Sequence, residues 1–334
     1  MTNTMLVVLM LLVSSSLLQA QENKQPVDYV DPNIGGIGQL LTATVPYVQC
    51  PHGMARLAPM TTPGITDRYL ADKIYGFPAG PAMLMVSTGD ITTDPAAYAS
   101  DFDHDFETAT PYYYAADLLS WRVKAEFTAT PQAAYYRFTF PASDHAHLAV
   151  GFGRDAEFTI AGASAIEGSQ RVFGPVAKLA DDTQPTRQYF YAEFSRPFAE
   201  YQTWQGEKLA RDAKGKGDRI GFVSQFATRA GDKIEVRVGI SYISAEQARR
   251  NLQREITNWN FDVVKAGTRE LWNQALGAVI VTGGSERQRT IFYTALYRSF
   301  GRMTDITEDG RYFSGYDHRV HDAQGHDFYI DDGL

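Results

Sequence analysis

The stretch KIEVRVGISYISAEQARRNLQREI, residues 233–256, changes its hydrophobic period part-way along. Apolar residues occupy every second position from Ile234 to Ile240, which predicts a strand with one buried face. From Ser244 onward the apolar residues recur at helical spacing, and Gln247 follows Ser244 at the distance of a capping box. The stretch therefore predicts that a β domain ends and a helical region begins near residue 244.

The residues before this boundary carry the signals of strands and turns. WRVKAEFTAT (121–130) and AAYYRFTFP (133–141) also alternate with a period of two, and Gly- and Pro-containing turns separate such segments. Many short antiparallel strands of this kind predict a β-sandwich. We expect a mainly β fold, with an antiparallel β-sandwich over residues 26–243.

The residues after the boundary change to helical patterns. FDVVKAGTRELWNQAL (261–276) and SERQRTIFYTALYRSFGRM (285–303) have helical spacing, and AVIVTG (278–283) between them predicts a short strand. We expect a helical linker over residues 244–302. Turns and short strands return over residues 303–334.

Length and composition limit the class of protein. The chain has 334 residues, more than the ~250–300 at which a single core stops growing, so two domains are expected. Its net charge of −8 argues against a nucleic acid partner, which would require a basic surface. Cys50 is the only cysteine, so an intrachain disulfide is excluded.

The first twenty residues are typical of an export signal. Met5 to Val13 form an apolar run, followed by small and polar residues up to Ala20. This run is shorter than the ~20 residues needed to span a bilayer, so no membrane span is expected here. We predict a signal peptide over residues 1–20 and an exported protein, in a bacterial periplasm, at the cell surface or secreted.

Three polar motifs are candidates for sites. SDFDHDFETATP (100–111) lacks the glycine of a calcium loop, so a solvated edge or loop is favoured. GYDHRVHDAQGHDF (315–328) contains three histidines among aspartates, which leaves either a zinc site or an exposed polar hairpin. NIGGIGQ (33–39) lacks the Lys-Ser/Thr of a phosphate loop, and favours a tight turn or a close approach to a ligand. The residues alone give no catalytic set.

Six stretches in order carry a family resemblance. They are YVDPNIGG (29–36), FDHDFETATPYYYAADL (102–118), KAEFTATPQAAYYRFTFP (124–141), VGISYISAEQARRNL (238–252), IFYTALYRSF (291–300) and DGRYFSGYD (309–317). Together they resemble glycoside hydrolase family 92, the calcium-dependent exo-acting α-mannosidases. The resemblance implies an N-terminal sandwich, a helical linker and an (α/α)6 barrel, of which residues 303–334 would be the truncated start.

The resemblance also implies an inverting mechanism on mannose-containing glycans, with Ca²⁺ as cofactor. The family keeps its general acid, its general base and most calcium ligands in the barrel. We therefore expect no catalytic residue in this chain, and the metal ligands stay unassigned.

Four residues are candidate substrate contacts. His52 and Gly53 lie in GQLLTATVPYVQCPHGMARLAP (38–59), which departs from the family pattern in a loop that borders the sugar pocket in relatives. Asp331 and Asp332 precede the motif that opens the barrel in the family, which leaves them either lining the pocket or serving in a helix cap or loop. Adjacent carboxylates point in different directions on a regular element, so they make a poor acid–base pair.

The sequence leaves three functions open. The first is the N-terminal part of an exported α-mannosidase, inactive as this fragment. The second is a non-catalytic carbohydrate-binding or assembly module, and the third is another sandwich-plus-barrel enzyme such as a glycoside phosphorylase. We also expect an apolar face of the linker helices to pack on the rest of the barrel: Leu252, Ile256, Leu271, Trp272 and Leu276.

Overall fold

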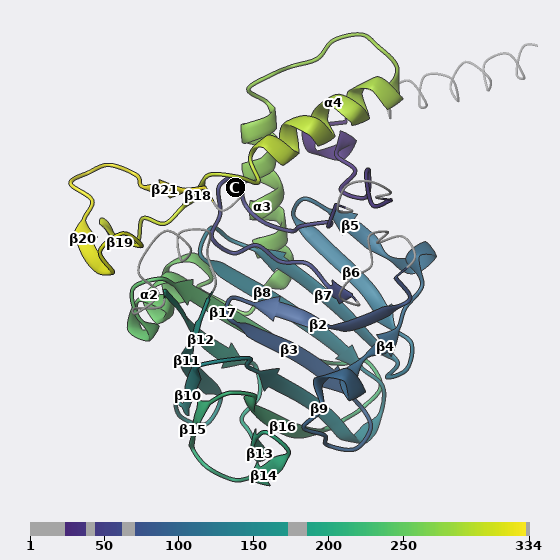
Figure 1. Ribbon diagram of the computed structural model, residues 1–334. Helices are drawn as coiled ribbons and strands as arrows, with labels where there is room; N and C mark the ends of the chain where they lie inside the picture. The colour runs from purple at the N-terminus through teal and green to yellow at the C-terminus, as the bar shows by residue number, and fades with distance from the viewer. Residues whose placement is uncertain (1–23, 38–43, 62–70, 173–185, 332–334) are drawn as a thin grey trace, which may run out of the picture.

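Two antiparallel sheets pack face to face, and three helices follow them along the chain (Figure 1). This computed structural model describes residues 24–37, 44–61, 71–172 and 186–331. The expected mainly β sandwich followed by helices is confirmed. The predicted signal peptide, residues 1–20, lies outside the described residues. None of the helices described is long and apolar enough to cross a membrane.

The first sheet has the strand order β1-β2-β3-β9-β16-β13-β14, and β4 pairs with β2. Its strands are β1 (Met60–Thr61), β2 (Lys73–Ala79), β3 (Ala82–Ser87), β4 (Ser100–Asp101), β9 (Ser143–Gly151), β13 (Glu200–Gln205), β14 (Lys208–Ala210) and β16 (Ile220–Thr228). Two short 3-10 helices, η3 (Pro95–Tyr98) and η4 (His104–Phe106), lie on either side of β4 in the chain.

The second sheet has the strand order β15-β10-β11-β12-β17-β8-β7-β6-β5. Its strands are β5 (Thr108–Thr110), β6 (Tyr113–Leu118), β7 (Val123–Ala129), β8 (Ala133–Phe140), β10 (Ala156–Ile160), β11 (Ala165–Arg171), β12 (Arg187–Phe194), β15 (Lys214–Gly217) and β17 (Asp232–Ser241). The alternating stretches of the sequence form its central strands β7, β8 and β17.

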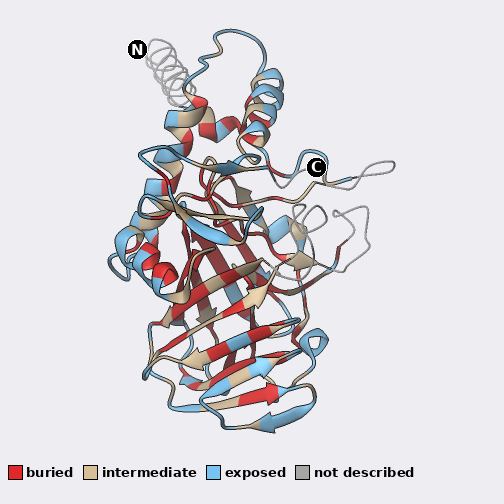
Figure 2. Cartoon of the chain, turned by 60° about the vertical axis from the view of Figure 1, so that its left-hand side comes forward, coloured by how far each residue is buried: buried red, intermediate tan, exposed pale blue. Residues whose placement is uncertain are grey.

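The main hydrophobic core lies between the two sheets, where the strands are buried (Figure 2). The even-numbered face of β17 from Ile234 to Ile240 is at most 1% exposed, as its alternation predicts. Val123, Ala125 and Phe127 of β7 belong to the same core. Successive side chains of a strand point to opposite faces, so the other face of the second sheet needs a separate cover.

The helix α2 (Ala245–Glu255) provides that cover. Ser244 caps it by accepting a hydrogen bond from the backbone N–H of Gln247, as predicted. The side chain of Gln247 does not complete a capping box, because its Oε1 accepts from Arg250 and Arg311 while the N–H of Ser244 donates to Oγ of Ser241. A Cβ at Gly239 of β17 would lie 1.9 Å from the carbonyl oxygen of Ala248, so the absent side chain allows the helix to approach the sheet.

The helices α3 (Phe261–Leu276) and α4 (Glu286–Ser299) pack with η1 (Pro26–Tyr29) beside the sandwich (Figure 1). The prediction that an apolar face of the linker helices packs on the rest of the barrel is wrong for four of the five residues named. Leu252 and Ile256 are buried against the second sheet, and Trp272 and Leu276 against η1 and α4. Leu271 alone of the five is exposed, at 39%. The four buried side chains already have partners within the fold.

In the C-terminal region the structure contradicts the predicted strand AVIVTG and confirms the predicted polar hairpin. AVIVTG is not a strand, because its backbone at Val279 and Val281 is hydrogen-bonded to the hydroxyl of Tyr293 in α4. The polar hairpin is confirmed as β19 (Arg311–Ser314) paired with β20 (Arg319–Asp322). A second pair, β18 (Thr304–Asp305) with β21 (Tyr329–Ile330), closes the segment around it.

Candidate functional site

His52 joins the loop before β1 to the segment that follows α4. Its Nδ1–H donates to the carbonyl oxygens of Met303 at 2.9 Å and Arg302 at 3.2 Å. The ring also lies edge-on to Phe300 and Tyr329, with centroids 5.4 and 5.7 Å away. These contacts bring two segments about 250 positions apart into one site, and they leave Nε2 as the ring atom that a substrate could meet.

The other predicted contacts lie around this point. Gly53 is buried in the same turn, where its N–H donates to the carbonyl of Cys50 at 2.9 Å. Asp331 is exposed directly after β21, two positions from the Tyr329 ring that meets His52. Asp332 lies outside the described residues. The fold thus places His52, Gly53 and the start of the Asp331–Asp332 pair on one side of the sandwich.

The thiol of Cys50 is not a reactive partner for the ring of His52. Its Sγ lies 3.7 Å from the carbonyl oxygen of Ala129, while Nδ1 of His52 is hydrogen-bonded to Met303 and Arg302. Burial raises the pKa of the Cys50 thiol far above its usual range, so it stays protonated. A cysteine–histidine nucleophile pair is therefore not formed.

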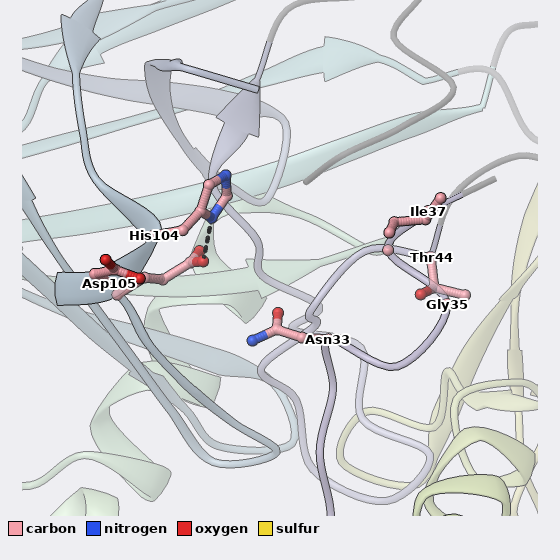
Figure 3. A pocket seen from close by; sticks show the side chains of 8 residues that line it. Asn33, Gly35, Ile37, Thr44, His104 and Asp105 are labelled. Atoms are coloured by element: carbon pink, nitrogen blue, oxygen red, sulfur yellow. Dashed lines mark hydrogen bonds and ion pairs between the residues drawn. The ribbon is translucent and has the colours of Figure 1, made fainter. Parts of the chain in front are cut away.

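A cavity of about 340 Å³ lies between η4 and the glycine-containing loop after η1 (Figure 3). We call it the η4 pocket; its lining includes Asn33, Ile37, Thr44, His104, Asp105 and Glu107. Asp103 caps η4 by accepting from the N–H of Asp105 at 2.9 Å, which turns the chain so that His104 and Glu107 face the same side. The sequence predicts only a solvated edge or loop here, and the three-residue spacing of His104 and Glu107 is the signal that could have indicated a site.

The pair His104 and Glu107 has a defined hydrogen-bond arrangement. Nε2 of His104 faces the carbonyl oxygen of Ala71 at 2.9 Å, and Nδ1 faces Oε2 of Glu107 at 2.8 Å. A carbonyl oxygen can only accept, so Nε2 carries a proton, and a second proton is shared between Nδ1 and the carboxylate. The side chain of Glu107 is only 4% exposed, and its Oε1 has no hydrogen-bond partner among the described residues.

A second polar cluster joins α2 to the segment before β19. Glu308 is fully buried and accepts hydrogen bonds from Asn251 at 2.7 Å and from the backbone N–H of Tyr242 at 2.9 Å. Burial raises the pKa of the Glu308 carboxyl, while the hydrogen bond from Gln247 lowers the pKa of the neighbouring Asp309. The carboxylates here are engaged in holding the helix, and this cluster is structural.

Calcium would require six to eight oxygen ligands around one point. Within the described ranges, no group of three or more His, Cys, Asp or Glu residues is arranged to hold a metal ion. In the η4 pocket the carboxylate of Glu107 is already engaged by His104 through one oxygen. The described side chains do not fit a calcium centre, and we derive no catalytic step through one.

Two family descriptions match this chain along most of its length. Residues 29–241 match "Glycosyl hydrolase family 92 N-terminal domain", and residues 247–334 match "Glycosyl hydrolase family 92 catalytic domain". The chain belongs to glycosyl hydrolase family 92. The resemblance drawn from the six stretches is confirmed. The change between the two matches falls between residues 241 and 247. The predicted domain boundaries at residues 243 and 302 stay predictions.

Solved family 92 enzymes from Bacteroides thetaiotaomicron share the fold of this family 92 chain. A family GH92 inverting mannosidase is 28% identical, with a TM-score of 0.83 over 93% of this chain and 44% of its own. A family GH92 α-mannosidase, solved also in complex with mannoimidazole, is 25% identical, with a TM-score of 0.81 over 92% of this chain and 45% of its own. The chain thus spans less than half the length of these enzymes.

A fungal protein matches a shorter part. It is named "Uncharacterized secreted glycosidase", from Arthroderma benhamiae, and is 33% identical over 88 residues. The match covers 25% of the family 92 chain and 11% of the fungal protein.

Proposed function

We propose that this chain is the N-terminal part of an exported family 92 α-mannosidase that removes terminal α-mannosyl residues from glycans. The observation that carries the proposal is the match of both family domains in order along one chain, at residues 29–241 and 247–334. One solved relative is described as an inverting mannosidase, and another relative binds mannoimidazole. We transfer α-mannoside hydrolysis to this chain from these two relatives.

The proposed mechanism is inverting and calcium-dependent. In an inverting glycosidase one carboxylic acid protonates the leaving oxygen and a second carboxylate activates water on the opposite face of the ring. Within the described residues we assign neither group, and we propose that both, with the calcium ligands, come from the longer catalytic domain of the family. The 334-residue chain alone is then inactive. Its own contribution is one wall of the substrate site, with His52, Gly53, Asp331 and Asp332 as the proposed contacts.

The experiment is an assay of the complete reading frame beside the 334-residue chain. We expect the complete protein to release mannose from α-linked mannobioses, to form β-mannose first in the NMR spectrum, and to lose activity with a calcium chelator. The shorter chain should release none. An α-mannose first product would contradict inversion, and activity that survives chelation would contradict the calcium requirement.

A non-catalytic carbohydrate-binding module is the second candidate, and the η4 pocket on the described sandwich favours it. The two candidates differ in turnover. A complete reading frame that binds mannosides but never releases mannose would favour the module.

A further inference from the structure

A buried histidine lies on the outer face of the first sheet. The strand pairings place Ser87 of β3, His147 of β9 and Gln225 of β16 in one row across three neighbouring strands. His147 is 1% exposed, and among the described residues neither of its ring nitrogens makes a hydrogen bond of ordinary geometry. The hydroxyl of Ser87 is buried without a partner in the same part of the structure. Buried polar groups are usually hydrogen-bonded, so this row contains two groups that the observed conformation leaves unsatisfied.

Residues 88–99, between β3 and β4, cover this face of the sheet; we call them the η3 segment. Side chains two positions apart on a strand share a face, so His147 shares its face with Ala149. Ala149 packs in a small apolar cluster with Tyr98 of the η3 segment and Trp204 of β13. This cluster is separate from the main core between the sheets, and Tyr98 anchors the segment in it.

The η3 segment has internal hydrogen bonds that allow it to move as a unit. Asp94 caps η3 by accepting from the N–H of Ala96 at 2.9 Å, and the hydroxyl of Tyr98 donates to the carbonyl of Thr92 at 3.1 Å. The segment is joined to the turn after β6 by Trp121, whose Nε1–H donates to the carbonyl of Tyr98 at 3.0 Å. Separation from Trp121 would therefore leave the internal bonds of the segment intact.

The groups around His147 do not compensate a proton on its ring. Asp90 of the η3 segment favours the protonated ring and His145 of β9 opposes it, while β3 and β16 present the uncharged Ser87 and Gln225. Burial has the largest effect and lowers the pKa of His147 below its ordinary value of 6.5. The ring therefore binds a proton more tightly when it is uncovered than when it is covered.

We propose that the η3 segment is a latch that opens when His147 takes up a proton. The ring nitrogens are inaccessible while the segment is closed, so the proton enters as the segment lifts, and the charged ring then opposes its return. Opening separates Tyr98 from Trp121 and uncovers the apolar cluster. It also widens a cavity of about 570 Å³ that Pro95 of the segment lines together with Trp204. This inference does not depend on the proposed α-mannosidase activity.

The indole N–H of Trp121 reports on the latch, because its hydrogen bond to Tyr98 belongs to the closed state. Its exchange with solvent is measured by NMR in the 334-residue chain, corrected for the intrinsic exchange rate at each pH, and its signal is assigned with Trp121→Phe. We expect the corrected rate to rise by about tenfold from about pH 7.5 to about pH 5.5, as the uptake of one proton by a histidine predicts.

Two histidines of β9 provide a matched pair of variants. His147→Gln should abolish the rise in exchange, because an amide does not titrate. His145→Gln should keep the wild-type rise, since His145 lies two positions away on the same face of the strand but is exposed. His147→Phe, which places an uncharged ring in the same space, repeats the test if the glutamine variant fails to fold.

The Trp272 indole separates latch opening from unfolding of the whole chain. Its N–H donates to the carbonyl of Gln49, far along the chain from the η3 segment, and its corrected exchange should not change with pH. An equal rise at Trp121 and Trp272 would overturn the latch, as would no rise at Trp121 in the wild type. A rise that persists without His147, or that disappears in His145→Gln, would also overturn it. The wild-type comparison of the two indoles decides the matter even if neither His147 variant folds.

Discussion

The side-chain amide of Asn251 donates to the carboxylate of Glu308 at 2.7 Å, and both residues are 0% exposed. Asn251 lies in α2 and Glu308 in the segment between β18 and β19. The same amide also donates to the backbone carbonyl of Ile240 in β17 at 2.9 Å. One side chain therefore links the second sheet, the helix and the C-terminal segment, in a place that water does not reach.

Replacing Asn251 by alanine should destabilise this junction. The buried carboxylate of Glu308 would lose a donor, and a hydrogen bond to a charged group contributes about 1.5–3 kcal/mol. We expect the free energy of unfolding in urea to fall by about that amount. Glu246→Gln, whose side chain is 78% exposed in the same helix, should change it by less than about 0.5 kcal/mol. An equal loss in both variants would contradict the role of the junction.

The same carboxylate predicts a pH dependence of stability. Burial raises the pKa of Glu308 in the folded protein above its ordinary value of 4.5, so the folded state holds this proton more tightly than the unfolded state. Its contribution to stability is therefore greatest below pH 4.5 and decreases as the pH rises through the folded pKa.

Glu308→Gln removes this titration. The difference in unfolding free energy, wild type minus variant, should become less favourable to the wild type from pH 4.5 to about pH 7, measured by urea unfolding at each pH. A difference that stays constant over this range would show that Glu308 does not titrate differently in the folded state.

Gly239 and Gly267 should respond in opposite directions to alanine. A Cβ at Gly239 would lie 1.9 Å from the backbone oxygen of Ala248, so Gly239→Ala must push α2 away from the sheet. We expect a loss of about 3 kcal/mol or more, in the range of severe overpacking. A methyl group on Gly267, inside α3, would meet no atom within 4 Å, and Gly267→Ala should stabilise by about 0.5–1 kcal/mol. Thermal unfolding of the two variants measures both signs, and a loss in both would contradict the prediction.

Adjacent positions in α3 separate the buried from the exposed side of that helix. Trp272 is 0% exposed and its Nε1–H donates to the carbonyl of Gln49 at 2.6 Å, whereas Leu271 is 39% exposed. Trp272→Ala should cost about 3–5 kcal/mol, and Leu271→Ala about 1 kcal/mol or less. Chemical unfolding compares the two. Similar losses would mean that α3 is not anchored through Trp272.

His52 should be replaceable by asparagine but not by alanine. Its φ of 58° lies in the left-handed region, which asparagine tolerates better than alanine, and only a polar side chain can donate to the carbonyl of Met303. We expect His52→Ala to cost about 1–2 kcal/mol and His52→Asn about half of that. Hydrogen exchange of the Asp305 N–H, which donates to the His52 carbonyl at 2.9 Å, reports directly on this contact. Faster exchange in the asparagine variant than in the alanine variant would contradict it.

The sequence predicts those parts of the fold that depend on local pattern. The alternation from Ile234 to Ile240 indicates the buried face of β17, and Ser244 indicates the start of α2, because period and capping are properties of neighbouring residues. AVIVTG is predicted as a strand and is not one. Its apolar, β-branched composition suits a strand, but a strand needs a partner, and here the Tyr293 hydroxyl takes the backbone groups instead.

For the family and the candidate site, too, some features follow from the sequence and others only from the tertiary structure. The sequence by itself determined the family, since six stretches that resemble it occur in order along the chain, and it predicts His52 in a loop beside the substrate. Only the tertiary structure decided that His52 meets Tyr329 and that Leu252 and Trp272 are already buried. It also decided that His104 and Glu107 line a cavity together with Asn33. The physical reason is distance along the chain: these contacts join residues dozens to hundreds of positions apart, and their burial depends on which surfaces the two sheets and three helices bring together.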